Sequence, residues 1–79
     1  MKDLYILIAK VLEIDVAAIG RDTGPGNEPR WDSFSHVHVM IAVEDRYGIE
    51  LNPEEIATLL TVNDIALMLR SKGLEGLEE

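Results

Sequence analysis

The spacing of apolar residues predicts a first helix over residues 3–13. Leucine, isoleucine and valine recur there at intervals of three or four positions, and Lys10 and Glu13 fall outside this apolar stripe. Asp3 suits the start of the helix, because an acidic side chain is favourable in the first turn. We therefore expect a one-sided helix that packs its apolar face against the rest of the chain.

A second helix is predicted over Ser33–Tyr47, with Asp32 as its N-cap and Gly48 as the left-handed residue that ends it. Two apolar stripes follow this helix, one made of Val39, Met40, Val43 and Tyr47 and the other of Phe34, Val37 and Ile41. A helix that is apolar on more than one side is either central in a bundle or covered by a partner. The second stripe is therefore a candidate docking face.

Residues 14–30 join these two helices and are rich in glycine and proline, which excludes a continuous helix. The segment is predicted as a long loop. We expect Asp15 to cap a short turn and residues 16–19 to fold back over the core. Long connections in compact domains are usually functional or mobile.

Two shorter helices are predicted towards the C-terminus. Asn52, Pro53 and Glu55 give the first of them an N-cap, a proline at the first helical position and an acid at the third. Its buried side is expected to consist of Ile56, Leu59 and Leu60. Residues 61–64 form another capping box and begin the last helix, which Gly73 closes.

These elements predict an all-α fold, a small four-helix bundle with a long loop between its first two helices and a short third helix. Residues 1–79 are expected to form one domain, with residues 73–79 as a frayed acidic tail. No segment shows the alternation of a strand. An apolar fraction of 47% argues against disorder, although a chain of 79 residues is near the lower limit for a stable core.

The charge narrows the choice of partners. Fifteen acidic and seven basic residues give a net charge of −8, which opposes nucleic acids and anionic lipid surfaces and suits proteins with basic patches. The same acidity would also serve solubility alone. There is no cysteine, no signal-peptide pattern and no apolar run of the roughly 20 residues that span a membrane. We expect a cytoplasmic monomer without membrane insertion.

Ser33 stands where the loop stops and the second helix begins. It can cap backbone N–H groups, or it can present its hydroxyl at the positive end of the helix, where a phosphate is favourably placed. A triad of Asp32, Ser33 and His36 is disfavoured, since no oxyanion hole or glycine elbow accompanies it. His36 and His38 point in different directions and do not suggest a metal site. We expect His36 beside the loop, His38 towards solvent and no catalytic residue.

Three stretches, Trp31–Val37, Val43–Leu51 and Thr61–Ile65, resemble acyl carrier proteins, small acidic four-helix proteins that hold acyl groups as thioesters. The family signature is aspartate-serine-leucine, and its serine carries 4′-phosphopantetheine. The resemblance implies that Ser33 is the attachment residue, between Asp32 and Phe34. Asp32 would also help to bind the phosphopantetheinyl transferase that takes the group from coenzyme A.

The resemblance further implies a non-catalytic carrier that presents acyl intermediates to acyl-loading and acyl-processing enzymes of fatty acid, polyketide or specialised lipid biosynthesis. Phe34 departs from the usual leucine, and Ser35 and His38 stand where many fatty-acid carriers are acidic. A specialised carrier fits these departures better than a housekeeping fatty-acid carrier does. A peptidyl or aminoacyl carrier and a cofactor-free acidic interaction module are the alternatives.

Docking and cargo residues can also be assigned. Val37 and Ile41 are expected to form an apolar centre for partner enzymes, with ordinary packing against the third helix as the alternative. The acidic flanks of this centre would be Glu44, Asp45, Glu54 and Glu55. The residues expected to line a space for an acyl chain are Met40, Val43, Ile56, Leu59, Ile65 and Met68. Trp31 is expected to anchor the loop, with stacking on a ligand as the alternative.

Overall fold

The computed structural model describes residues 2–73 and confirms the all-α prediction. Within these residues the helices are α1 (Lys2–Leu12), the 3₁₀ turn η1 (Val16–Ala18), α2 (Ser33–Tyr47), α3 (Pro53–Thr58) and α4 (Val62–Ser71). No strand occurs among them. None of these helices is long and apolar enough to cross a lipid bilayer. Gly73 is described, and residues 74–79 of the predicted tail lie outside the described residues.

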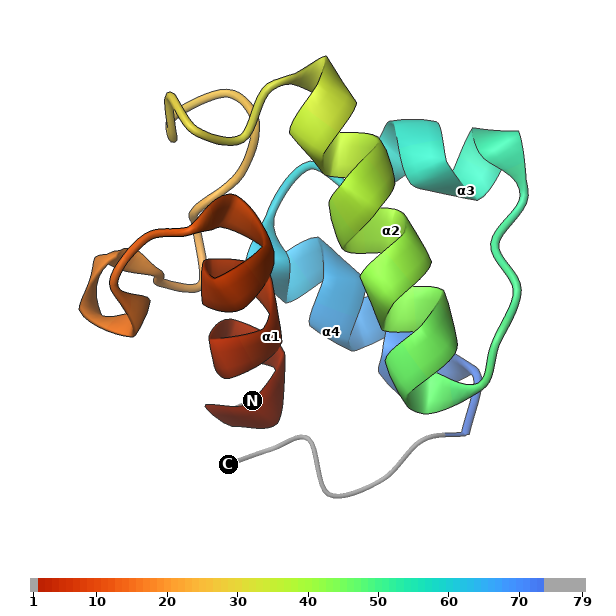
Figure 1. Ribbon diagram of the computed structural model, residues 1–79. Helices are drawn as coiled ribbons and strands as arrows, with labels where there is room; N and C mark the ends of the chain where they lie inside the picture. Colours follow the sequence, from red (N-terminus) through yellow and green to blue (C-terminus); the bar gives the residue numbers. More distant parts are fainter. Residues whose placement is uncertain (1, 74–79) are drawn as a thin grey trace.

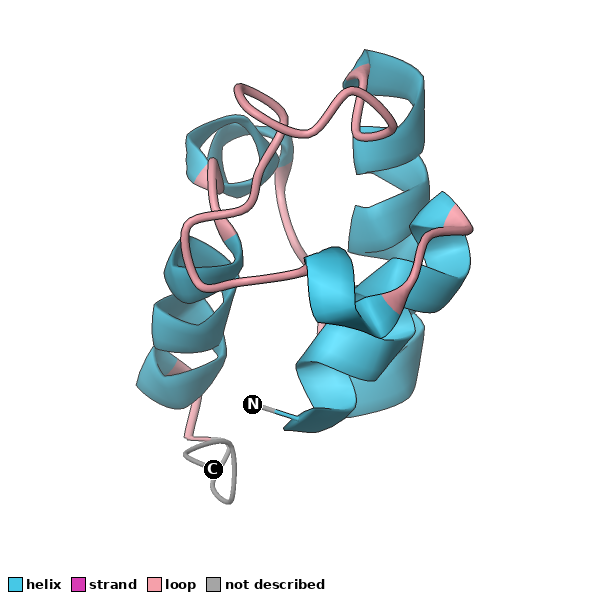
Figure 2. Ribbon diagram, turned by 90° about the vertical axis from the view of Figure 1, so that its left-hand side faces the viewer, coloured by secondary structure: helices cyan, strands magenta, loops and turns pink. Residues whose placement is uncertain are grey.

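Helix α2 crosses the molecule between α1 on one side and α3 on the other, with α4 behind it (Figure 1). The long loop that joins α1 to α2 runs over the side that faces the viewer in Figure 2. The helices enclose one core, whose largest fully buried side chains are Trp31, Leu4, Ile8, Met40, Ile65, Leu69, Val39, Val43 and Val62. The apolar stripe predicted for the first helix and the first stripe of the second helix therefore supply much of the core, while their members Leu7, Val11 and Tyr47 pack against it and are only partly buried.

The predicted caps account for most helix boundaries. The Asp32 carboxylate accepts a hydrogen bond of 2.8 Å from the backbone N–H of Ser35, and Gly48 ends α2 in the left-handed region. Asn52 and Glu55 form a complete capping box at α3. The first helix is shifted by one residue from the prediction, because Glu13 already has a left-handed φ of 60° and cannot continue it.

The capping box predicted for α4 is only half formed. The Thr61 hydroxyl accepts a hydrogen bond from the backbone N–H of Asp64, as expected. The Asp64 carboxylate, however, accepts from the N–H of Leu60 at 3.1 Å rather than from that of Thr61. The helix closes at Gly73, whose φ is 87°.

The long loop is fixed to the start of α4. The carbonyl of Thr23 accepts a hydrogen bond from Val62 N–H, and the carbonyl of Arg21 accepts one from Asn63 N–H, both at 2.9 Å. Gly24 is buried at this junction, where a Cβ would overlap the carbonyl of Leu60. The glycine is therefore required by close backbone approach.

Two expectations about burial are wrong. Of residues 16–19 only Ile19 is buried, because Asp15 caps η1 and the turn holds the other three side chains out to solvent. Leu60 was expected on the buried side of the third helix, but it is 59% exposed while Leu59 is 5% exposed. Helix α3 ends at Thr58 and Leu59 is extended, so successive side chains point to opposite sides.

Candidate functional site

Ser33 is the first residue of α2 and is exposed. Its hydroxyl forms no hydrogen bond within residues 2–73, because the carboxylate of Asp32 takes the N-cap role. The hydrogen bond from the backbone N–H of Ser35 also holds the pKa of the Asp32 carboxyl below its ordinary value. Of the two roles open to Ser33, capping is thus filled by its neighbour, and presentation of the hydroxyl remains.

The surroundings of Ser33 suit a phosphate ester on its oxygen. The hydroxyl lies at the N-terminal end of a 15-residue helix, where the peptide dipoles favour an anion. Phe34 beside it is 72% exposed, so the neighbouring side chain leaves the hydroxyl open to a large substituent. The Phe34 ring packs on His38 one turn further, with 4.7 Å between the ring centroids. His38 is exposed, as predicted.

The second apolar stripe of α2 stays open to solvent. Val37 is 49% exposed and Ile41 is 56% exposed, and with Phe34 they form what we call the outer face of α2. The inner face consists of Val39, Met40 and Val43. Packing against the third helix, the alternative explanation for Val37 and Ile41, therefore does not bury them.

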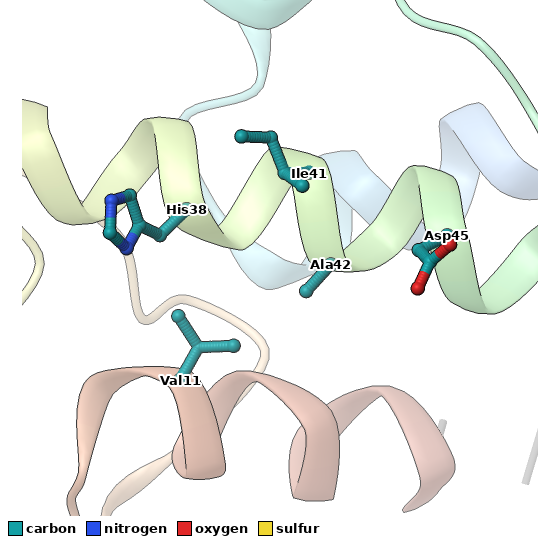
Figure 3. Close-up of a pocket in the computed structure, with 5 residues that line it drawn as sticks. All are labelled: Val11, His38, Ile41, Ala42 and Asp45. Atoms are coloured by element: carbon teal, nitrogen blue, oxygen red, sulfur yellow. The ribbon is translucent and has the colours of Figure 1, made fainter.

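A shallow groove of about 470 Å³ lies between α1 and α2, beside the outer face. Its lining residues are Val11, His38, Ile41, Ala42 and Asp45. In Figure 3, Val11 of α1 points towards α2, Ala42 points back towards α1, and Ile41 projects away from α1. Two of the predicted docking residues, Ile41 and Asp45, thus lie at the edge of a hollow.

The four predicted acidic flanking residues differ in their surroundings. Glu44 accepts a 2.7 Å hydrogen bond from Leu51 N–H and so holds the connection after α2. Glu55 completes the α3 capping box and pairs with Lys72 at 3.2 Å. The pKa of the Glu55 carboxyl is lowered, mainly because it accepts a hydrogen bond from the backbone N–H of Asn52 and to a lesser degree because of Lys72.

Asp45 and Glu54, in contrast, are exposed carboxylates without a hydrogen bond or ion pair to the rest of residues 2–73. Only these two of the four predicted flanking acids are therefore available to a partner without loss of an internal bond.

Trp31 is completely buried, which confirms it as the anchor of the loop. Its indole Nε1–H donates a 2.9 Å hydrogen bond to Nδ1 of His36, and Nε2 of the same imidazole lies 3.0 Å from the carbonyl oxygen of Ile56. His36 thus lies beside the loop as predicted. This chain of hydrogen bonds was not predicted from the sequence, where the only signal was a tryptophan and a histidine on either side of a helix start.

The same contacts bear on chemistry at Ser33. Both ring nitrogens of His36 are directed to Trp31 and Ile56, so the imidazole is not placed to act on the serine hydroxyl. Within residues 2–73 no group of three or more histidine or acidic side chains is arranged to hold a metal ion.

The residues predicted to line an acyl chain gather in the core. Met40, Val43, Leu59 and Ile65 are buried, and Ile56 and Met68 pack against them while partly exposed.

Comparison with known proteins adds to this geometry. The family model described as "Phosphopantetheine attachment site" matches residues 2–69. An acyl carrier protein of Rhodococcus erythropolis (strain PR4) is 29% identical over 76 residues, which cover 96% of this chain and 84% of that protein. One of Streptomyces coelicolor is 34% identical over 64 residues, covering 81% and 70%. One of Helicobacter pylori (strain G27) is 23% identical over 73 residues, covering 92% and 94%.

Proposed function

This chain belongs to the acyl carrier protein family, whose domain is the attachment site for 4′-phosphopantetheine, and on that premise we propose that Ser33 is the residue that bears the group. The observation that carries the proposal is the exposed Ser33 hydroxyl, released from capping by Asp32 at the start of the 15-residue helix. Ser35 and Ser71, the other serines of the chain, lie within or at the end of a helix, and the Ser71 hydroxyl is bonded to the Met68 carbonyl.

When bound, the group supplies a thiol on which acyl groups are held as thioesters. The chain itself has no cysteine, so that thiol would be the one thiol of the loaded protein. In this arrangement the Ser33 oxygen would hold the phosphate of the group as an ester, Asp32 would hold the first turn of α2 and Phe34 would flank the link. The engagement of both His36 ring nitrogens supports the proposal that a separate phosphopantetheinyl transferase activates the hydroxyl.

The cargo we propose is an acyl group, passed among acyl-loading and acyl-processing enzymes of fatty acid, polyketide or specialised lipid biosynthesis. The relatives are named acyl carrier proteins, which favours acyl over peptidyl or aminoacyl cargo. A cytoplasmic monomer suits such traffic. Met40, Val43, Ile56, Leu59, Ile65 and Met68 would admit the acyl chain between the helices, because methionine adapts to irregular shapes.

Partner enzymes would dock on the outer face of α2 through basic patches. Val37 and Ile41 offer an apolar centre, and Asp45 and Glu54 offer unengaged negative charge. Charge complementarity of this kind raises association rates more than affinity, which suits a carrier that must leave each enzyme after one step.

The test is enzymatic loading followed by intact mass measurement. Purified apo protein is incubated with coenzyme A and a broad-specificity phosphopantetheinyl transferase, with a parallel sample that lacks coenzyme A. We expect one phosphopantetheinyl group to be added to the wild type and to the control variant Ser35→Ala, and none to Ser33→Ala. Absence of the mass gain, or a gain that survives Ser33→Ala, would contradict the proposal and favour a cofactor-free interaction module.

A further inference from the structure

The hydrogen bonds of His36 require one particular form of its ring. Indole Nε1–H is only a donor, so Nδ1 of His36 must accept from Trp31. The imidazole proton then resides on Nε2, which donates to the carbonyl oxygen of Ile56. A neutral ring with one acceptor and one donor therefore links the end of the loop, the first turn of α2 and α3.

The carbonyl of Ile56 needs this partner. Helix α3 has six residues, and the last carbonyl groups of a helix lack intrahelical donors. The backbone N–H of Leu59 reaches Ile56 O at a long 3.4 Å, whereas His36 Nε2 lies at 3.0 Å. So short a helix is not stable alone and depends on its attachments. The bond from His36 attaches its C-terminal half to α2, and the Glu55–Lys72 ion pair attaches it to the end of α4.

Ser33 lies inside the segment that this network closes. Trp31 is two residues before it and His36 three residues after it, and the side chains of these two residues are bonded to each other. Closing a segment of six residues removes much of the conformational freedom of its backbone. Because the Trp31 side chain is completely buried, the closed segment is also held to the core.

We propose that His36 is a positioning residue for Ser33. Through its two ring nitrogens it fixes the first turn of α2 against the loop and α3, so that the modifying transferase meets the serine hydroxyl and α3 in one defined arrangement. His36 takes no part in the bond-forming step. The inference rests on the proposed attachment of phosphopantetheine at Ser33.

The decisive comparison is His36→Gln with His36→Leu. Glutamine offers an amide oxygen to Trp31 and an amide N–H to Ile56, whereas leucine offers neither and leaves the buried indole N–H without a partner. For transferase-catalysed loading from coenzyme A, we expect kcat/KM to fall about 10- to 100-fold in His36→Leu, since small misplacements of a reacting group have effects of this order. His36→Gln should stay within a few-fold of wild type.

A spectroscopic readout accompanies the kinetics. The Trp31 indole proton should exchange slowly with deuterated solvent in the wild type and in His36→Gln, and quickly in His36→Leu. Ile8→Val, a conservative change on the buried face of α1, serves as the control for lowered stability. All rates are measured at a temperature at which circular dichroism shows every variant to be folded, so that Ile8→Val should load at the wild-type rate.

Three results would overturn the positioning role: a folded His36→Leu that loads like wild type, a His36→Gln as slow as His36→Leu, or an equal loss in Ile8→Val. If His36→Leu does not fold, Trp31→Phe decides in the same assay, because it removes the indole donor and leaves the Ile56 bond. A slower Trp31→Phe supports the role and a wild-type rate refutes it. Failure of the wild type itself to load would instead contradict the proposed function.

Discussion

On α2, Val39, Met40 and Val43 of the inner face are buried, whereas Phe34, Val37 and Ile41 of the outer face are exposed. Both faces are apolar and belong to one helix, so the residue types do not explain the difference. The inner face meets α1 and the rest of the core, while the outer face meets solvent. Apolar surface kept open in this way is typical of an interaction site. The comparison teaches that one face of α2 maintains the fold and the other is available to partners.

The largest expected effect separates the two faces by stability. Met40 and Ile41 are neighbours of similar size, one buried and one exposed. Met40→Ala should lower the free energy of unfolding by about 2–5 kcal/mol, because it removes packed atoms and leaves a cavity. Ile41→Ala should change it by less than about 0.5 kcal/mol. Urea denaturation followed by circular dichroism measures both, and similar losses for the two variants would erase the distinction between the faces.

The next effect tests the outer face in a kinetic assay. Asp45→Lys should raise the KM of the loading transferase several-fold, and more so at low salt, because it places a positive charge at the edge of the outer face. Asp22→Lys makes the same charge change on an exposed loop residue and is the matched control. Glu44 is unsuitable for this test, since its carboxylate holds Leu51 N–H. Equal effects of Asp45→Lys and Asp22→Lys on KM would show that the overall charge matters and the position of Asp45 does not.

A smaller effect concerns the helix starts and leaves both faces unchanged. The pKa values of Asp32 and Glu55 lie below their ordinary values of 3.8 and 4.5, chiefly because each carboxylate accepts a backbone hydrogen bond. A lowered pKa in the folded state means that the ionised group adds stability above the ordinary pKa and loses it as the pH falls through the folded value.

The expected result is therefore a difference between variants that depends on pH. The gap in urea midpoint between wild type and Asp32→Asn should be largest near pH 6 and should shrink towards pH 3, and Glu55→Gln should behave alike. Because Asp32 is exposed and Glu55 is partly exposed, solvent screens both carboxylates, and the gap should be smaller than the effect of Met40→Ala. A gap that stays constant or widens in acid would show that the ionised caps do not stabilise the fold.

The elements of the fold could be predicted because their signals are local. Asp32, Asn52 and Thr61 each cap a helix through an atom three residues away, and Gly48 ends α2 by its own backbone angle. The exposed hydroxyl of Ser33 followed from the same logic, once Asp32 was assigned as the cap.

The errors arose where distant segments decide the outcome. Leu60 is exposed because α3 stops two residues before the end of its apolar pattern, and the carboxylate of Glu44 turns to Leu51 across the next connection. The His36 bridge depends on Ile56, twenty residues further along the chain. Periodicity cannot report such contacts, since they are set by how the elements pack.

Locating the added group within the loaded protein tests the central claim most directly. Cleavage after Arg30 and Arg46 releases residues 31–46, which contain Ser33 and Ser35. Fragmentation of this peptide in the mass spectrometer distinguishes the two serines. We predict that the phosphopantetheinyl group is on Ser33 in every loaded molecule. A group on Ser35 or Ser71, or an unmodified 31–46 peptide from loaded protein, would contradict the account.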